Sequence, residues 1–165
     1  MDAAGHRWRA PPAGMDAVIF RSVILGEPVG EGRPRAVRMG PRVRVHAAPK
    51  SAVWRAVAAQ QMAAEWGDKP PWSAMCGVTV TAYMPRPKSR PKDISKEAWK
   101  LGSAMSRTQK PDVDNIAKAV LDAIVQAGII TDDTQVVRLM VFRLMCGIES
   151  DVTPRVDVRV DFIEP

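Results

Sequence analysis

The sequence predicts an α+β fold: a single domain in which a mixed β-sheet carries helices packed on one face. The chain has 165 residues, the size of one ordinary domain. Hydrophobic residues make up 46% and charged residues 25%, a balance typical of globular proteins and unlike disordered or fibrous ones. Apolar periodicity switches along the chain in the order strand, hairpin, helix, strand, helix, strand, strand, which indicates a mixed sheet with helices on a face.

Residues 1–14 are polar and rich in proline, and we expect them to form a flexible tail before a domain that spans 15–165. They lack the apolar core of a secretory signal, and no stretch approaches the roughly 18 apolar residues of a membrane span. Cys76 and Cys146 lie far apart without metal-binding spacing, which is typical of reduced core cysteines. We therefore expect a cytoplasmic protein with no membrane partner.

A β-branched run over 17–25 predicts a strand that ends at Gly26. Arginines then recur on both sides of a Gly-Pro break, a pattern that suits a hairpin or loop with a basic edge. These arginines are Arg33, Arg35, Arg38, Arg42 and Arg44. Two interpretations stay open: the charges protect a strand edge from aggregation, or they bind a polyanion. Five arginines without an acid between them are more than edge protection requires.

Helical spacing predicts a helix over Pro49–Trp66, with Trp54 and Met62 in the core. After a Gly/Pro-rich break, apolar residues alternate with Thr and Tyr over Gly77–Met84, which predicts a strand with one buried face.

Residues 85–111 read as an irregular segment with a brief helix around Ile94–Lys100. Prolines keep its first part extended, so that cations are displayed along a loop. Among these cations are Arg86, Lys88 and Arg90. Such a loop serves solubility in most proteins, but beside a metal site it could hold a phosphate backbone.

Two strands are expected to close the chain. Val136–Met145 is apolar on both faces apart from two arginines, which predicts a central strand. In the last strand, valines at 156, 158 and 160 alternate with charged residues, which predicts one buried face.

Charge is divided unevenly along the chain. Residues 1–110 hold 19 basic and 8 acidic residues, whereas residues 111–165 hold 5 basic and 10 acidic ones, so that a net charge of +6 hides a basic body and an acidic segment. The basic part could attract nucleic acid, and clustered carboxylates could hold a cation.

The acidic segment contains the residues with the clearest chemical pattern. A helix with a buried stripe is expected from Asn115 to a stop at Gly128. Two carboxylates, Asp112 and Asp114, lie at its start, and Asp132 and Asp133 lie in the loop before the next strand. Four acids drawn together repel one another unless a cation neutralises them. Mg²⁺ prefers such oxygen ligands and leaves room for a phosphate oxygen.

Lys118 lies one turn after Asp114, where it could meet a scissile phosphate. Each of these residues also has a structural interpretation. The first two aspartates could cap the helix, Asp132 and Asp133 could open a turn, and Lys118 could pair with Asp114 or Asp122. We interpret Asp122 as structural, because its neighbour Lys118 explains it.

The string Asp112-x-Asp114-Asn115-x-x-Lys118, followed by Leu121-Asp122-Ala123, Gly128 and Asp132-Asp133-x-Gln135-Val136, resembles the signature of the RusA family of Holliday junction resolvases. These are small, dimeric, Mg²⁺-dependent endonucleases, often encoded by phages and prophages. The early Gly32-Arg33-Pro34-Arg35 is similar to the family's basic first hairpin.

The resemblance implies a catalytic set and a metal-binding set of residues. The catalytic residues would be Asp112, Asp114, Lys118 and Asp133, and the metal ligands would be Asp112, Asp114, Asp132 and Asp133. The cofactor would be Mg²⁺, with Mn²⁺ as a substitute. Lys110 falls at a position that is often basic in the family. The expected partners are a second copy of the chain and four-way junction DNA, which would be cut by paired symmetric nicks.

Helix length separates the two pairs of acids. From Asn115 to Ala127 a helix rises about 20 Å, and the extended chain from Gly128 to Asp133 returns only about 17 Å. We therefore hypothesise that a dimer completes each site with acids from both subunits. The sequence leaves two other functions open: a nuclease with a broader substrate range that includes flaps and other branched DNA, and a non-catalytic DNA-binding module. The presence of all four acids and Lys118 argues against the second.

Overall fold

The structure is a computed structural model that describes residues 19–32, 35–39, 42–46, 49–92, 94–101, 110–147 and 152–163. Of the hairpin residues 35–39 and 42–46 only the backbone is described. The tail expected at residues 1–14 lies outside the described residues, and so does Arg33. No helix within the described ranges is long and apolar enough to cross a membrane.

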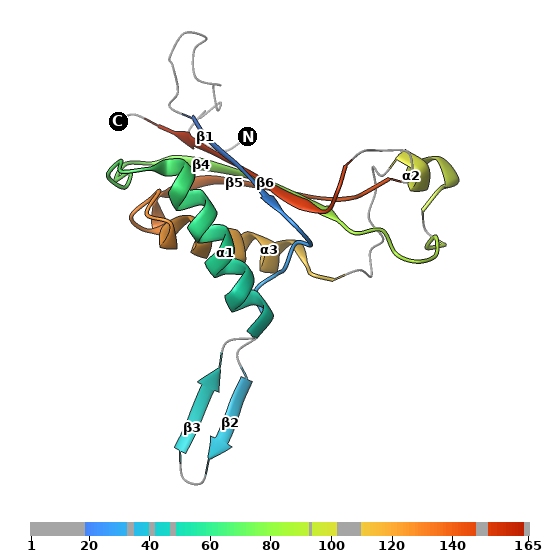
Figure 1. The fold of residues 1–165 in the computed structure, drawn as a ribbon, viewed down its shortest axis with the longest axis horizontal. Helices are drawn as coiled ribbons and strands as arrows, with labels where there is room; N and C mark the ends of the chain where they lie inside the picture. The colour runs from blue at the N-terminus through green and yellow to red at the C-terminus, as the bar shows by residue number, and fades with distance from the viewer. Residues whose placement is uncertain are drawn as a thin grey trace, which may run out of the picture.

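One mixed sheet forms the body of the protein (Figure 1). Its strands are β1 (Ile19–Leu25), β4 (Cys76–Met84), β5 (Val136–Met145) and β6 (Arg155–Phe162), in the order β1-β6-β4-β5. Strands β4 and β5 run parallel, and the other two pairs are antiparallel.

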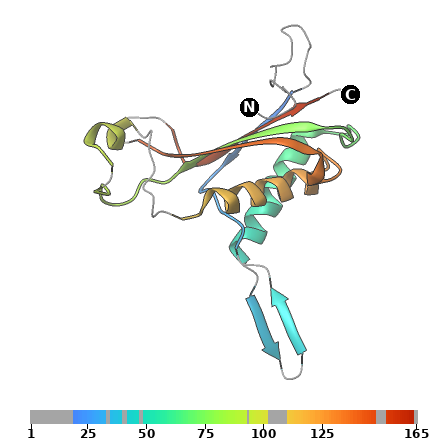
Figure 2. The same ribbon diagram turned by 180° about the vertical axis from the view of Figure 1, so that it is seen from behind.

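Two helices, α1 (Pro49–Trp66) and α3 (Val113–Gln126), lie on the same face of this sheet (Figures 1 and 2). The predicted α+β class with helices on one face is therefore confirmed. The other described elements are smaller. Strands β2 (Arg35–Met39) and β3 (Arg42–His46) pair as a projecting hairpin, α2 (Lys96–Leu101) lies between β4 and α3 in the chain, and the short helix η1 (Asp133–Gln135) precedes β5.

The core lies between the sheet and the two helices. Alternate residues of β4 and β6 are buried, including Val78, Val80 and Val158, as the period of two predicts. Helix α3 buries the stripe of Ile116, Val120 and Ile124 against them.

Helix α1 has the predicted bounds and buries Met62, while Trp54 packs at the margin of the core. Val53 and Val57 are exposed on the same helix. The helix therefore meets the core through Ala58, Ala59 and Met62 and through Trp66 at its end, which contacts the rings of Phe20 and Phe162.

The prediction that Val136–Met145 is a central strand is wrong, because β5 forms an edge of the sheet. Four of its apolar side chains, at Val137, Leu139, Met140 and Phe142, are between 42 and 56% exposed. The two internal places belong to β4 and β6, although β6 carries charges on its outer face. Those charges are satisfied within the sheet by ion pairs, for example Arg155 with Asp157 at 2.8 Å. The apolar character of β5 therefore reflects an uncovered edge and not burial on both faces.

Burial in this core predicts the cost of truncating a side chain. Ile124→Ala should lower the free energy of unfolding by about 2–5 kcal/mol, because the wild-type side chain is fully buried. Leu25→Ala is the control, since Leu25 is 72% exposed and its truncation should cost less than about 0.5 kcal/mol. Urea unfolding of both variants measures the difference. Equal losses would contradict this placement of the core.

Candidate active site

The start of α3 is held on two sides by neighbouring elements. Arg143 of β5 donates a hydrogen bond from Nη1 to the carbonyl oxygen of Pro111, at 2.6 Å. The backbone N–H of Glu31 donates to the carbonyl oxygen of Asn115, at 2.8 Å. Gly30 packs so closely that a Cβ there would lie 2.6 Å from Cβ of Pro111. The first turn of α3 is thereby fixed between β5 and the connector that follows β1, residues 26–32.

Asp112 and Asp114 display their carboxylates at this fixed helix start. Asp112 occupies the N-cap position of α3, but its side chain makes no capping hydrogen bond. Both residues are exposed, and the positive end of the helix dipole stabilises carboxylates there. The side chain of Asp112 therefore does not cap the helix, which was the alternative interpretation, and its carboxylate is exposed to solvent.

A pocket of about 600 Å³ borders Asp112, between the connector after β1 and the start of α3. Its charged lining mixes acids with two lysines, Lys50 and Lys110. Lys50 was missed by the sequence reasoning. The available signal was a lysine in the first turn of a helix, where the helix dipole disfavours a cation.

Asp132 and Asp133 follow the end of α3, where Gly128 turns the chain with a positive φ of 71°. Asp132 caps η1, since its side chain accepts a hydrogen bond from the Thr134 N–H at 2.9 Å. The Gln135 side chain accepts from the Asp132 N–H and donates to the carbonyl oxygen of Ala74 at 2.8 Å. The hydrogen bonds from Thr134 lower the pKa of the Asp132 carboxyl. For Asp132 the turn interpretation is therefore confirmed.

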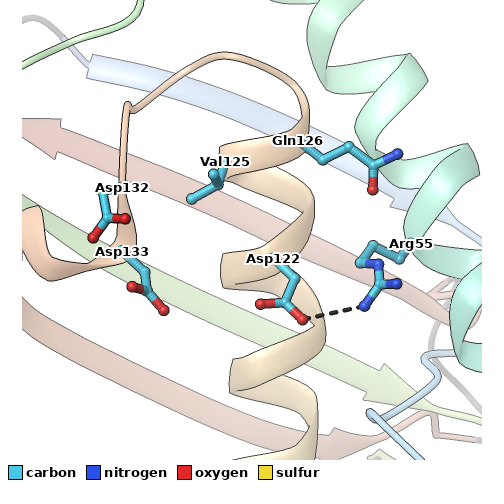
Figure 3. Close-up of a pocket in the computed structure, with 6 residues that line it drawn as sticks. All are labelled: Arg55, Asp122, Val125, Gln126, Asp132 and Asp133. Carbon is cyan, nitrogen blue, oxygen red and sulfur yellow. Dashed lines mark hydrogen bonds and ion pairs between the residues drawn. The ribbon is translucent and has the colours of Figure 1, made fainter. Parts of the chain in front are cut away.

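Asp133 lines a second pocket, of about 390 Å³, beside the second half of α3 (Figure 3). Its other polar lining includes Asp122 and Arg55, and the carboxylates of Asp122 and Asp133 point toward the same space. Asp122 pairs with Lys118 at 3.2 Å, as the structural interpretation predicted. It also pairs with Arg55 at 3.2 Å, a contact that the sequence reasoning missed. The signal was an arginine inside the otherwise apolar run of α1.

The structure keeps the two pairs of acids apart within one chain. Asp114 lies two turns before Asp122, a rise of about 12 Å, and Asp132 and Asp133 lie beside Asp122. Over the described ranges, no group of three or more acids, histidines or cysteines could hold a metal ion. One chain therefore presents two separate pairs of carboxylates.

The basic segments lie on either side of the start of α3 (Figures 1 and 2). The hairpin projects on one side, with the backbone of Arg35, Arg38, Arg42 and Arg44 in its two strands. The segment around α2 projects on the other. There Arg86 stacks over the ring of Trp99, and Arg90 donates to the carbonyl oxygen of Ile94, so both help to hold this segment together. Lys88 is exposed between them.

Comparison with known proteins adds two findings. The family described as Endodeoxyribonuclease RusA matches residues 26–161, a range that includes both pairs of aspartates. The chain is also similar to the uncharacterized protein YqaN of Bacillus subtilis (strain 168). The two are 32% identical over 149 residues, which cover 88% of this chain and 96% of YqaN.

The cap at Asp132 predicts a pH-dependent stability. Its folded-state pKa is lowered, so its contribution is fully present above the pKa of the unfolded chain and is lost as pH falls through the folded value. Asp132→Ala should therefore lower the free energy of unfolding at about pH 7 and have almost no effect at about pH 2. Asp132→Asn, which keeps an oxygen acceptor without the charge, is the control. At about pH 7 its free energy of unfolding should lie between those of the wild type and Asp132→Ala. Urea unfolding at both pH values measures this, and a loss independent of pH would contradict it.

Proposed function

The chain belongs to the RusA endodeoxyribonuclease family, and we propose that it is a Mg²⁺-dependent nuclease that resolves four-way DNA junctions by paired symmetric nicks. The observation that carries this proposal is the fixed, exposed carboxylate pair of Asp112 and Asp114, on a domain whose match to the family runs through both acidic pairs.

The donor chemistry of this pair fits Mg²⁺. Proteins bind this ion through one or two carboxylates, and water and substrate phosphate supply the remaining oxygens. Asp112 and Asp114 would hold it, with Asp132 and Asp133 as further ligands, and Mn²⁺ takes the same kind of oxygen ligand. When bound, Mg²⁺ would act as a Lewis acid that activates water and stabilises charge on the phosphoryl group.

The other residues of the chain would orient the DNA and balance its charge. Lys118 is 62% exposed one turn from Asp114, so its ammonium can reach a phosphate beside that carboxylate. Around the start of α3, Lys110 and the two projecting segments would hold the DNA backbone. The hairpin would contribute Arg35, Arg38, Arg42 and Arg44, with Arg33 shortly before it in the sequence, and the segment before α2 would contribute Arg86, Lys88 and Arg90.

The separation of the acids supports a homodimer with shared sites. Strand β5 begins at Val136, at the end of the short helix η1 that Asp133 opens, and it ends near the start of α3, where Arg143 binds Pro111. Its outer edge is apolar and exposed, and no strand of the described ranges pairs with it. If a second copy ran its own β5 antiparallel to this edge, each Asp133 would approach the partner's Asp112 and Asp114. A two-fold dimer of this kind would carry two sites, as paired nicks in a nearly two-fold junction require.

Cleavage of a labelled four-way junction tests the activity. With Mg²⁺ the wild type should introduce symmetric nicks in the junction and spare linear duplex and flap substrates. Asp114→Asn should lower the nicking rate by roughly 100-fold or more and still bind the junction. Equal cutting of all substrates would replace the resolvase with a broader branched-DNA nuclease. Tight binding without cutting in Mg²⁺ or Mn²⁺ would contradict catalysis altogether.

Mixing two inactive variants tests whether sites are shared. A dimer of one Asp114→Asn subunit and one Asp133→Asn subunit would have one doubly altered site and one intact site. A 1:1 mixture after subunit exchange should therefore regain about a quarter of the wild-type intact sites, measured as nicking of the junction. If each site lay within one chain, the exchanged mixture would stay as inactive as either variant alone.

A further inference from the structure

We infer that Arg55, supported by Glu31, is a positioning residue that fixes the ammonium group of Lys118 through the carboxylate of Asp122. This inference rests on the proposed role of Lys118 in cleavage. It assigns a function to an arginine on α1 that lies outside the acidic signature on α3.

The contacts form one continuous series of ion pairs, in which acidic and basic side chains alternate. Nη1 of Arg55 lies 3.3 Å from Oε2 of Glu31 and 3.2 Å from Oδ2 of Asp122. The other carboxylate oxygen of Asp122, Oδ1, accepts from Nζ of Lys118 at 3.2 Å. Each oxygen of Asp122 therefore contacts a different cation, and the arginine side fixes the orientation of the carboxylate that faces Lys118.

The side chains in this series of contacts become more exposed toward Lys118, as is required if the less exposed end is to hold the more exposed one in position. The side chains of Glu31, Asp122 and Arg55 are 15, 27 and 26% exposed, whereas that of Lys118 is 62% exposed. The inner pairs are therefore screened less by water and salt than the outer one. The backbone of Glu31 is itself bound to Asn115 at the start of α3, which ties the support to the helix that carries Lys118.

An exposed Lys–Asp pair four residues apart on a helix is weak by itself and leaves the lysine free to sample several rotamers. Arg55 removes one source of this freedom, because it holds the carboxylate of Asp122 from a second helix, α1. Arg55 also lines the pocket that Asp122 shares with Asp132 and Asp133, where it offsets part of their negative charge (Figure 3). Asp122 can thus direct Lys118 without being repelled out of place.

Two variants of Arg55 and one control separate positioning from DNA binding. Arg55→Ala should lower the single-turnover nicking rate roughly tenfold and leave the junction Kd unchanged. Arg55→Lys should recover most of the rate, because a single nitrogen atom makes both contacts in the wild type. Arg21→Ala, on the exposed side of β1, should change neither quantity. An Arg55→Ala effect on Kd alone would overturn the inference, and so would a loss that Arg55→Lys does not recover.

A double variant tests whether Arg55 acts through Lys118. In a Lys118→Ala background, Arg55→Ala should cause no further loss of nicking, since there is no ammonium left to position. A full additional tenfold loss in that background would overturn the inference.

A readout without cleavage separates this inference from the proposed function. Arg55→Ala should raise the rate at which an amine reagent labels Lys118 by about twofold, measured by mass spectrometry on the folded protein. Unchanged labelling would overturn the positioning contact even in an active nuclease. Faster labelling in a protein that nicks no junction would support the contact and reject the proposed activity.

Discussion

The fixed position of the first turn of α3 is the constraint on which the rest of the site depends. Arg143 holds the carbonyl of Pro111 from β5, and the connector after β1 holds Asn115. Once this turn is fixed, the helical repeat sets where Asp114, Lys118 and Asp122 lie along one face. Because β5 and the connector are both parts of the folded body, the carboxylates at the helix start are placed by the core, although they are themselves exposed.

The same constraint explains why one chain presents its acids as two pairs. Helix α3 has 14 residues and a straight axis separates its ends by about 20 Å, so a loop that begins at its far end returns only to the level of Asp122. Strand β5 then runs back along the sheet edge toward the helix start. The two pairs of acids therefore lie toward the two ends of one exposed strand. Antiparallel association of two such strands is the simplest arrangement that would unite them, and it uses the apolar edge that the fold leaves uncovered.

Periodicity predicted the elements whose two faces differ in environment. The bounds of α1, the buried stripe of α3 and the alternation of β6 all follow from local spacing. It failed for β5, because an apolar run has the same appearance whether a neighbouring strand or a second chain covers it. It also missed Arg55, whose ion-pair partners come from elements far away in the sequence, and Lys50, which lines a pocket together with residues from the start of α3. The acidic signature could be read locally, whereas the support of Lys118 depends on how α1 crosses α3.

The measurement that tests this account most directly is Mg²⁺ affinity across a dilution series in which the oligomeric state is followed by sedimentation. If two copies complete each site, Mg²⁺ affinity should fall in parallel with the dimer fraction as the protein is diluted. Saturating Mg²⁺ should in turn favour association, by the square of the ratio between the site affinities of dimer and monomer, because each dimer would carry two sites. A monomer that binds Mg²⁺ with the full affinity of the concentrated protein would contradict shared sites and place a complete metal centre within one chain.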